Sequence, residues 1–154
     1  MAARSLECDL APSSAGSYAL VVALDRPHSI TIGRRGKFHF PAGFYVYLGS
    51  ALGPGGLAAR LTRHLGFEKR RHWHIDYLLG SKHAHVVQVW AVKSAARLEC
   101  KWARAAMRLP GASIVVPRFG ASDCRCPTHL IGFGELPDMT TLTDGLPASR
   151  MRIE

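Results

Sequence analysis

Three side chains that bind soft metal ions stand within six residues in the C-terminal third of the chain: Cys124, Cys126 and His129. Cys100 or Cys8 could supply the fourth ligand of a tetrahedral zinc site. Structural zinc sites favour cysteines separated by two to four residues. Here one residue separates them, so both sulfurs would reach a single ion only through an unusual turn. We therefore expect packing, or support of a neighbouring site, ahead of the zinc and redox alternatives.

Glu99 is an isolated carboxylate on an otherwise basic helix, which we expect over residues 94–109. It lies opposite a stripe of cations that fall within about 60° of one another: Arg97, Lys101, Arg104 and Arg108. No cation stands three or four residues from Glu99, so the usual ion pair along a helix is missing. The carboxylate therefore invites a metal ion or an arginine from elsewhere. The alternative is a partly exposed Glu in the first turn, which the helix dipole favours.

Basic residues also surround Trp73. His72, Trp73 and His74 follow Lys69-Arg70-Arg71, a pattern typical of a surface that tracks phosphates and offers a stacking platform. In the alternative interpretation the segment is structural: its apolar side chains pack, Asp76 caps a helix or pairs with His or Arg, and neither histidine touches substrate.

The overall charge favours a polyanionic partner. The formal net charge is +9 and the pI is about 10.0. Between residues 34 and 108 there are 14 Lys and Arg residues against three acidic ones, whereas residues 134–154 have an acidic excess. We expect nucleic acid as the partner, with DNA first. The alternative is an ordinary soluble surface.

The composition is that of a single globular domain. The chain has 154 residues, 47% of them hydrophobic and 20% charged. No apolar run approaches the ~18–20 residues of a membrane-spanning helix, and the start lacks the features of a signal peptide. We therefore expect a cytoplasmic protein with no membrane partner.

The order of predicted elements indicates an α/β (α+β) domain. Arg60 and His64 share one face of a helix whose leucines line another. The predicted helices cover 57–65 and 94–109, and the predicted strands cover 17–24 and 29–32 (as a hairpin), 44–48, 85–92, 113–116 and 130–133. We expect a small central, mostly antiparallel sheet flanked by helices over residues 16–133, an irregular lead-in over 1–15 and a flexible tail over 134–154.

Several of these residues together resemble the GIY-YIG endonuclease superfamily. They are Gly16-Ser17-Tyr18, Tyr47-Leu48-Gly49, a Gly-rich break, Arg60 and His64 on one helix, and Glu99 on another. The segments GFYVYLGSA, RLTRH, WHIDYLL and FGASDCRCPTHL look like the branch known as domain of unknown function family 123.

The sequence departs from the superfamily pattern in two ways. The first triplet is Gly-Ser-Tyr, and 29 positions separate Tyr18 from Tyr47, where a much shorter hairpin is usual. The extra length holds Arg34, Arg35 and Lys37, which would form a DNA-contacting ribbon or merely a longer hairpin arm.

The resemblance implies a role for each site residue in phosphodiester hydrolysis. Tyr18 would act as general base, with Tyr47 orienting the water or sharing that role. Arg60 would hold the scissile phosphate and His64 would transfer a proton or orient the tyrosine. Glu99 would hold one divalent ion, Mg²⁺ or Mn²⁺. A phenol is a poor base unless a nearby cation lowers its pKa.

The implied function is that of a metal-dependent endonuclease acting on DNA, in repair or processing, with a repair protein as a further partner. A branch-specific part of the site would comprise Ser122, Asp123, Cys124, Cys126 and His129. The expected nucleic-acid contacts are Arg34, Arg35, Lys37, Arg63, Lys69, Arg70, Arg71, His72 and His74. The alternatives are a non-catalytic nucleic-acid-binding module on the same scaffold and a zinc-stabilised adaptor that contacts protein.

Overall fold

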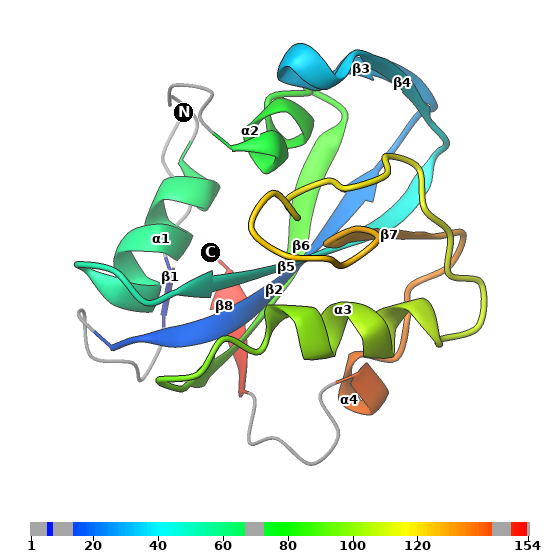
Figure 1. Ribbon diagram of the computed structural model, residues 1–154. Helices are drawn as coiled ribbons and strands as arrows, with labels where there is room; N and C mark the ends of the chain where they lie inside the picture. The colour runs from blue at the N-terminus through cyan, green and yellow to red at the C-terminus, as the bar shows by residue number, and fades with distance from the viewer. Residues whose placement is uncertain (1–5, 8–13, 67–72, 143–148, 154) are drawn as a thin grey trace.

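A computed structural model describes residues 6–7, 14–66, 73–142 and 149–153. Among these residues six strands form one sheet in the order β1-β8-β6-β2-β5-β7, and every neighbouring pair is antiparallel (Figure 1). The strands are β1 (Leu6–Glu7), β2 (Gly16–Leu24), β5 (Gly43–Ala51), β6 (Ala84–Lys93), β7 (Leu130–Phe133) and β8 (Ser149–Ile153). This is the α+β domain with a mostly antiparallel sheet that the sequence predicted.

Strand β2 is the centre of the sheet. It pairs with β5 along its whole length on one edge and with β6 on the other. Because successive side chains point to opposite faces, its unbroken apolar run fills two cores at once. Leu20 packs into the first core and Val21 into the second, both fully buried.

Helices cover both faces of this sheet. The first core lies under α1 (Gly56–Leu65) and α2 (His74–Leu79), and it also takes in Phe119 from the loop before β7. The second core lies under α3 (Glu99–Met107) and α4 (Met139–Leu142), with Trp102 as its largest side chain. In Figure 1, α3 lies below the strands and α1 and α2 above them.

The predicted hairpin between the first two strands is wrong. Strand β3 (His28–Thr31) pairs with β4 (Lys37–Phe40) instead, around the short 3₁₀ turn η1 (Gly33–Arg35). The physical reason is that both edges of β2 are already taken by β5 and β6, so β3 has no edge of β2 to pair with. The insertion between Tyr18 and Tyr47 is therefore a separate two-stranded ribbon.

Two predicted element boundaries also differ from the structure. The helix expected over 94–109 begins at Glu99, because the Ser94 hydroxyl accepts from the Ala96 N–H in a local turn and the Leu98 N–H donates to Ser17 Oγ. The strand expected over 113–116 is a single bridge between Ser113 and Gly132.

The expected flexible tail contributes structure to the domain. Within residues 134–154, α4 packs its Met139 and Leu142 into the second core, and β8 pairs with β6. The expected lead-in likewise contains β1, which pairs with β8. No helix in the described part of the chain is long and apolar enough to cross a membrane.

Candidate functional site

Tyr18 and Tyr47 lie side by side on one face of the sheet. In the β2–β5 register Tyr18 is opposite Gly49 and Leu20 is opposite Tyr47, so the two tyrosines are diagonal neighbours, with ring centroids 6.4 Å apart. A Cβ on Gly49 would stand 2.6 Å from the Tyr18 ring. The glycine of the Tyr-Leu-Gly triplet therefore makes room for the first tyrosine.

His64 completes this group from above the sheet. Helix α1 is anchored in the first core by its leucines, and this places His64 Nε2 2.7 Å from the Tyr18 hydroxyl oxygen. Its ring centroid is 6.2 Å from that of Tyr47. Tyr18 is 0% and His64 2% exposed, so the hydrogen bond is shielded from bulk water.

Burial keeps both tyrosines neutral. Loss of hydration raises the pKa of Tyr18 far above its usual value of 10.0; the cation of Arg60 opposes this rise and the carboxylate of Glu99 adds to it. The pKa of Tyr47 is also raised, chiefly by burial and then by Tyr18 and Glu99. The cation that a phenolate base would need is present, but desolvation outweighs it. Tyr18 is thus a hydroxyl at physiological pH.

Arg60 connects the buried pair to the surface. Its guanidinium donates to the Ser50 carbonyl oxygen at 3.3 Å, and its charge acts on the Tyr18 hydroxyl. It also lies 4.3 Å from the centroid of the Trp73 ring. A pocket of about 220 Å³ opens here, lined by Arg60, Arg63, Trp73 and the Gly-rich turn before α1. The pocket is thus lined by the arginine whose charge acts on the buried hydroxyl.

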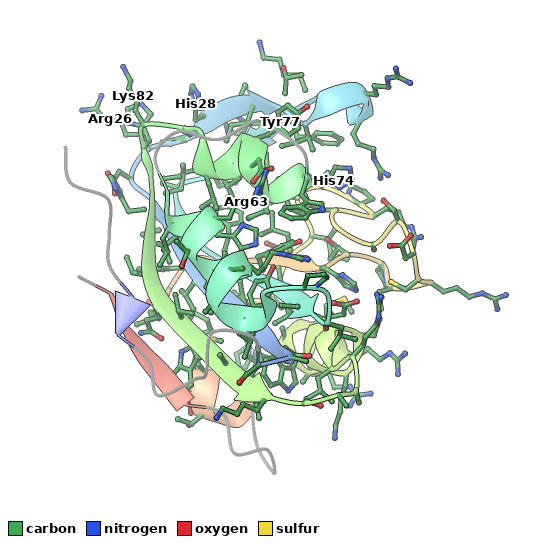
Figure 2. All side chains as sticks on the ribbon, turned by 90° about the vertical axis from the view of Figure 1, so that its left-hand side faces the viewer. Arg26, His28, Arg63, His74, Tyr77 and Lys82 are labelled. Atoms are coloured by element: carbon green, nitrogen blue, oxygen red, sulfur yellow. The ribbon has the colours of Figure 1, made fainter. Side chains whose placement is uncertain are left out.

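Arg63 serves the structure. Its guanidinium donates two hydrogen bonds to the buried Asp76, at 3.0 and 2.9 Å, and Asp76 also accepts from the Trp73 backbone N–H at 2.9 Å. As the structural interpretation of this segment predicted, Asp76 pairs with an arginine at the start of α2. Figure 2 shows Arg63 beside α2.

His74 is also occupied within the fold. Its Nδ1 accepts a hydrogen bond from the Gly120 N–H at 2.9 Å, which ties α2 to the loop before β7. Burial, followed by the charge of Arg35, lowers the pKa of His74 below 6.5. His74 thus has a structural role in the fold, and its expected contact with nucleic acid stays a prediction. The expected contacts Lys69, Arg70, Arg71 and His72 lie outside the described residues.

The insertion places its predicted cations in solvent: Arg34, Arg35 and Lys37 are all exposed on the β3–β4 ribbon. Arg35 donates to the carbonyl oxygen of Pro117 and so fastens the ribbon to the loop before β7. The predicted cations of the next helix are also exposed: Lys101 and Arg104 lie on α3, Arg97 just before it and Arg108 just after it. A further group of Arg26, His28 and Lys82 gathers at one corner of the molecule (Figure 2).

Glu99 lies in the first turn of α3. Its carboxylate is 3.7 Å from Arg97 Nη1, and its side chain is 15% exposed. The charge acts on both tyrosines and on His129. The expected lack of an ion pair along the helix is therefore offset by Arg97, which stands just before the helix begins and pairs with Glu99. Among the described residues, Glu99 belongs to no group of three or more potential metal ligands.

A second cluster of reactive side chains forms on the other side of Glu99. Cys100, Cys124, Cys126 and His129 present ligand atoms that all lie within 4.8 Å of one another. His129 Nε2 is 3.6 Å from Cys100 Sγ and 3.4 Å from Cys124 Sγ. Cys126 and His129 are buried, and burial raises the pKa of the Cys100 thiol to about 12.

This cluster corrects the expected cofactor. Three thiols and an imidazole form the donor set of a zinc-type site, whereas Mg²⁺ prefers oxygen ligands. The expectation of Mg²⁺ or Mn²⁺ at Glu99, with zinc disfavoured, is therefore wrong. Sequence spacing misled because the ligands come from two elements that only the fold brings together.

The turn that the Cys-x-Cys spacing requires is present, and Arg118 braces it. The Arg118 guanidinium donates to the carbonyl oxygens of both Cys124 and Cys126. Its own backbone has a φ of 64°, and its N–H donates to the Pro127 carbonyl at 2.6 Å. Sequence reasoning missed Arg118 because an arginine six residues before a cysteine follows no known ligand pattern.

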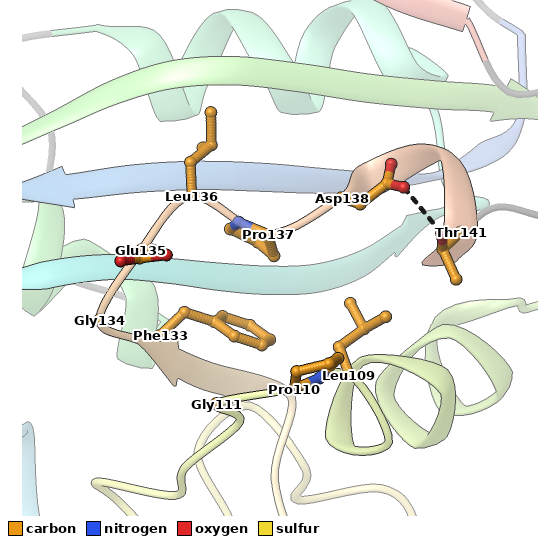
Figure 3. Close-up of a pocket in the computed structure, with 10 residues that line it drawn as sticks. All are labelled: Leu109, Pro110, Gly111, Phe133, Gly134, Glu135, Leu136, Pro137, Asp138 and Thr141. Atoms are coloured by element: carbon orange, nitrogen blue, oxygen red, sulfur yellow. Dashed lines mark hydrogen bonds between the residues drawn. The ribbon is translucent and has the colours of Figure 1, made fainter.

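The remaining branch-specific candidates, Ser122 and Asp123, are exposed at the tip of this loop and do not belong to the cluster. A larger groove, of about 630 Å³, lies elsewhere, between the end of β7 and α4 (Figure 3). It is lined by Leu109, Phe133 and Leu136 among others, and the Thr141 hydroxyl donates to Asp138 at its edge. None of the predicted site residues lines this groove.

Comparison with known proteins gives one match. The family described as Domain of unknown function DUF123 matches residues 17–148. The chain belongs to this family. No curated protein and no solved structure matches it significantly. The matched range spans the sheet from β2 to β7, both clusters and α4, so the DUF123 domain extends past the predicted boundary at residue 133.

Proposed function

We propose that this DUF123 domain hydrolyses phosphodiester bonds of nucleic acid, DNA in the first instance, as a nuclease of the GIY-YIG type. The observation that carries the proposal is the shielded 2.7 Å hydrogen bond between Tyr18 and His64, with Tyr47, Arg60 and Glu99 around it. A buried hydroxyl bonded to an imidazole, beside a fixed guanidinium, provides both proton transfer and charge stabilisation.

In the proposed reaction Tyr18 relays a proton and does not act as a phenolate. An attacking water gives its proton to the Tyr18 oxygen while the Tyr18 proton passes to His64 Nε2. The hydroxide adds to phosphorus and the bond from phosphorus to the leaving oxygen breaks. The leaving oxygen takes a proton from solvent, and His64 releases its extra proton to solvent, which restores the site. This sequence suits the raised pKa of Tyr18, because the tyrosine is never ionised for long.

Arg60 would bind the phosphate, and movement of its side chain would give the phosphate access to Tyr18. Since Tyr18 is fully buried and Arg60, whose charge acts on it, donates to the Ser50 carbonyl, substrate would reach the Tyr18 hydroxyl when Arg60 turns from Ser50 toward the phosphate. The pocket of about 220 Å³ beside Arg60 and Trp73 gives that phosphate a place to enter. Burial keeps the two tyrosines protonated, and the charge of Glu99 adds to the rise in their pKa values.

The test compares two buried tyrosines. Purified protein is incubated with labelled duplex, nicked, flapped and single-stranded DNA and RNA, across a panel of divalent cations. Tyr18→Phe is expected to lower cleavage by about 100-fold or more. Tyr45→Phe is the matched control, because the Tyr45 hydroxyl donates to the Pro41 carbonyl, away from His64.

Equal cleavage by the wild type and Tyr18→Phe would overturn the proposed mechanism. Salt-sensitive binding without cleavage by any of the proteins would instead support a non-catalytic nucleic-acid-binding module. The full burial of the Tyr18–His64 pair is the observation that favours this second candidate.

A further inference from the structure

We propose that Cys100, Cys124, Cys126 and His129 bind one zinc ion in a closed structural site. The site joins α3, on one face of the sheet, to the loop 118–129, which packs on the other face. It is independent of the proposed nuclease activity, since none of its four ligands belongs to the tyrosine group.

The distances fit one tetrahedral ion. Zn–S bonds of about 2.3 Å and Zn–N bonds of about 2.0–2.1 Å at tetrahedral angles place a sulfur and a nitrogen about 3.6 Å apart and two sulfurs about 3.8 Å apart. The two sulfur–nitrogen distances at His129 are 3.6 and 3.4 Å. All four ligand atoms lie within 4.8 Å, so a small inward movement of side chains gives the complete shell.

The surrounding backbone holds the ligands in place. His129 presents Nε2 to two of the sulfurs, and a Cβ on Gly120 would stand 3.4 Å from the His129 Cβ, so the loop backbone packs against this ligand. The backbone at His129 is fixed on both sides, since its N–H donates to Phe119 and its carbonyl accepts from Leu48. Arg118 holds the carbonyls of both cysteines in the loop.

Four protein ligands leave no open position, which indicates a structural ion and not a catalytic one. The ion would link α3, on one face of the sheet, to the loop 118–129 on the other. Cys100 stands in α3, which packs in the second core, while Phe119 of the loop packs in the first core against Tyr47, at a ring-centroid distance of 6.1 Å. An ion here fixes the position of this loop against Tyr47.

The first experiment measures metal content and coordination. The full chain, purified without added metal, is expected to contain one zinc per chain. Replacement by cobalt should give the intense d–d absorption of a tetrahedral site and a thiolate-to-cobalt charge-transfer band. Cys124→Ser is expected to lose the zinc and the charge-transfer intensity. Cys8→Ser changes the one cysteine of the sequence that is not a proposed ligand, and it should keep both.

Hydrogen exchange on the wild type keeps the proposal testable even if Cys124→Ser fails to fold. On chelation, amides of residues 116–129 and the first turn of α3 should exchange at least tenfold faster, while those of β3 and β4 remain unchanged. Zinc at background level in the wild type, a disulfide among the three cysteines, or equal zinc loss in Cys8→Ser would overturn the proposal. Loss of cleavage alone would bear only on the nuclease proposal.

Discussion

Glu99 and Cys100 are successive residues in the first turn of α3, yet their side chains belong to different centres. The Glu99 carboxylate acts on Tyr18 and Tyr47, whereas Cys100 Sγ lies 3.6 Å from His129 Nε2. One helical turn therefore carries a residue of each centre. Any change that moves the start of α3 alters both, so variants of this turn need a readout for each.

The close approach of Tyr18 to Gly49 predicts a large effect of a single methyl group. In Gly49→Ala the new Cβ would stand 2.6 Å from the Tyr18 ring, which cannot retreat because it is fully buried. We expect a loss of about 1–3 kcal/mol in the free energy of unfolding. Gly53→Ala is the control, since nothing lies within 4 Å of the Cβ it would add. Urea unfolding measures both, and equal stabilities would contradict the packing described for Tyr18.

The buried tyrosines predict instability at high pH. Burial raises the pKa of Tyr18 and Tyr47 well above 10.0 and that of Tyr45 to about 12. Unfolded tyrosines ionise near pH 10, so the stabilising contribution is complete below that pH and is lost as the pH rises toward the folded pKa. The free energy of unfolding should therefore fall above pH 10, by up to about 1.4 kcal/mol per pH unit for each tyrosine.

Tyr18→Phe removes one of these ionisable groups. The decrease in the free energy of unfolding per pH unit should therefore become smaller by the contribution of one tyrosine. Denaturant titrations at several pH values between 9 and 11 measure it. A slope that Tyr18→Phe leaves unchanged would show that Tyr18 ionises in the folded protein as it does in the unfolded chain.

The ion pair between Arg63 and Asp76 predicts that loss of the arginine is costly. Asp76 has no exposed side-chain surface, and Arg63 donates two hydrogen bonds to it. In Arg63→Met a buried carboxylate would lose its cation, so we expect a loss of about 3 kcal/mol in the free energy of unfolding. Arg108→Met, at an exposed position just after α3, should change the free energy of unfolding by less than about 0.5 kcal/mol. Similar values for the two variants would contradict the structural role assigned to Arg63.

The parts of the fold that the sequence predicted are those with local physical causes. The run from Ser17 to Leu24 is apolar at every position that fills one of two cores, and the helix from Leu57 to Leu65 repeats leucine every four residues. The pairing of β3 could not be predicted in the same way, because its local turn signal contains no information about whether the edges of β2 are free.

The sequence predicted one part of the candidate site and not the other. The order of Tyr18, Tyr47, Arg60 and His64 along the chain indicated a group that the fold brings together. The Cys-x-Cys pair argued against zinc on spacing alone, because the arginine that bends the loop and the cysteine that completes the donor set stand outside the motif. Spacing rules consider only the residues of the motif, whereas the Arg118 guanidinium holds the carbonyls of both cysteines from outside it.

Arg118 therefore predicts a metal-affinity effect without being a ligand. Its guanidinium donates to the Cys124 and Cys126 carbonyls, so in Arg118→Ala the loop loses the brace that turns both thiols to one side. Residues that orient metal ligands typically contribute 10–100-fold to affinity, and we expect zinc binding to weaken by about that factor. Competition with a zinc chelator measures the change. Arg125→Ala is the matched control: it stands exposed between the same two cysteines and should leave the affinity within about twofold, because a solvated side chain that orients no ligand contributes little. If the two variants weaken binding equally, the charge of the loop and not the bracing of its carbonyls governs the affinity.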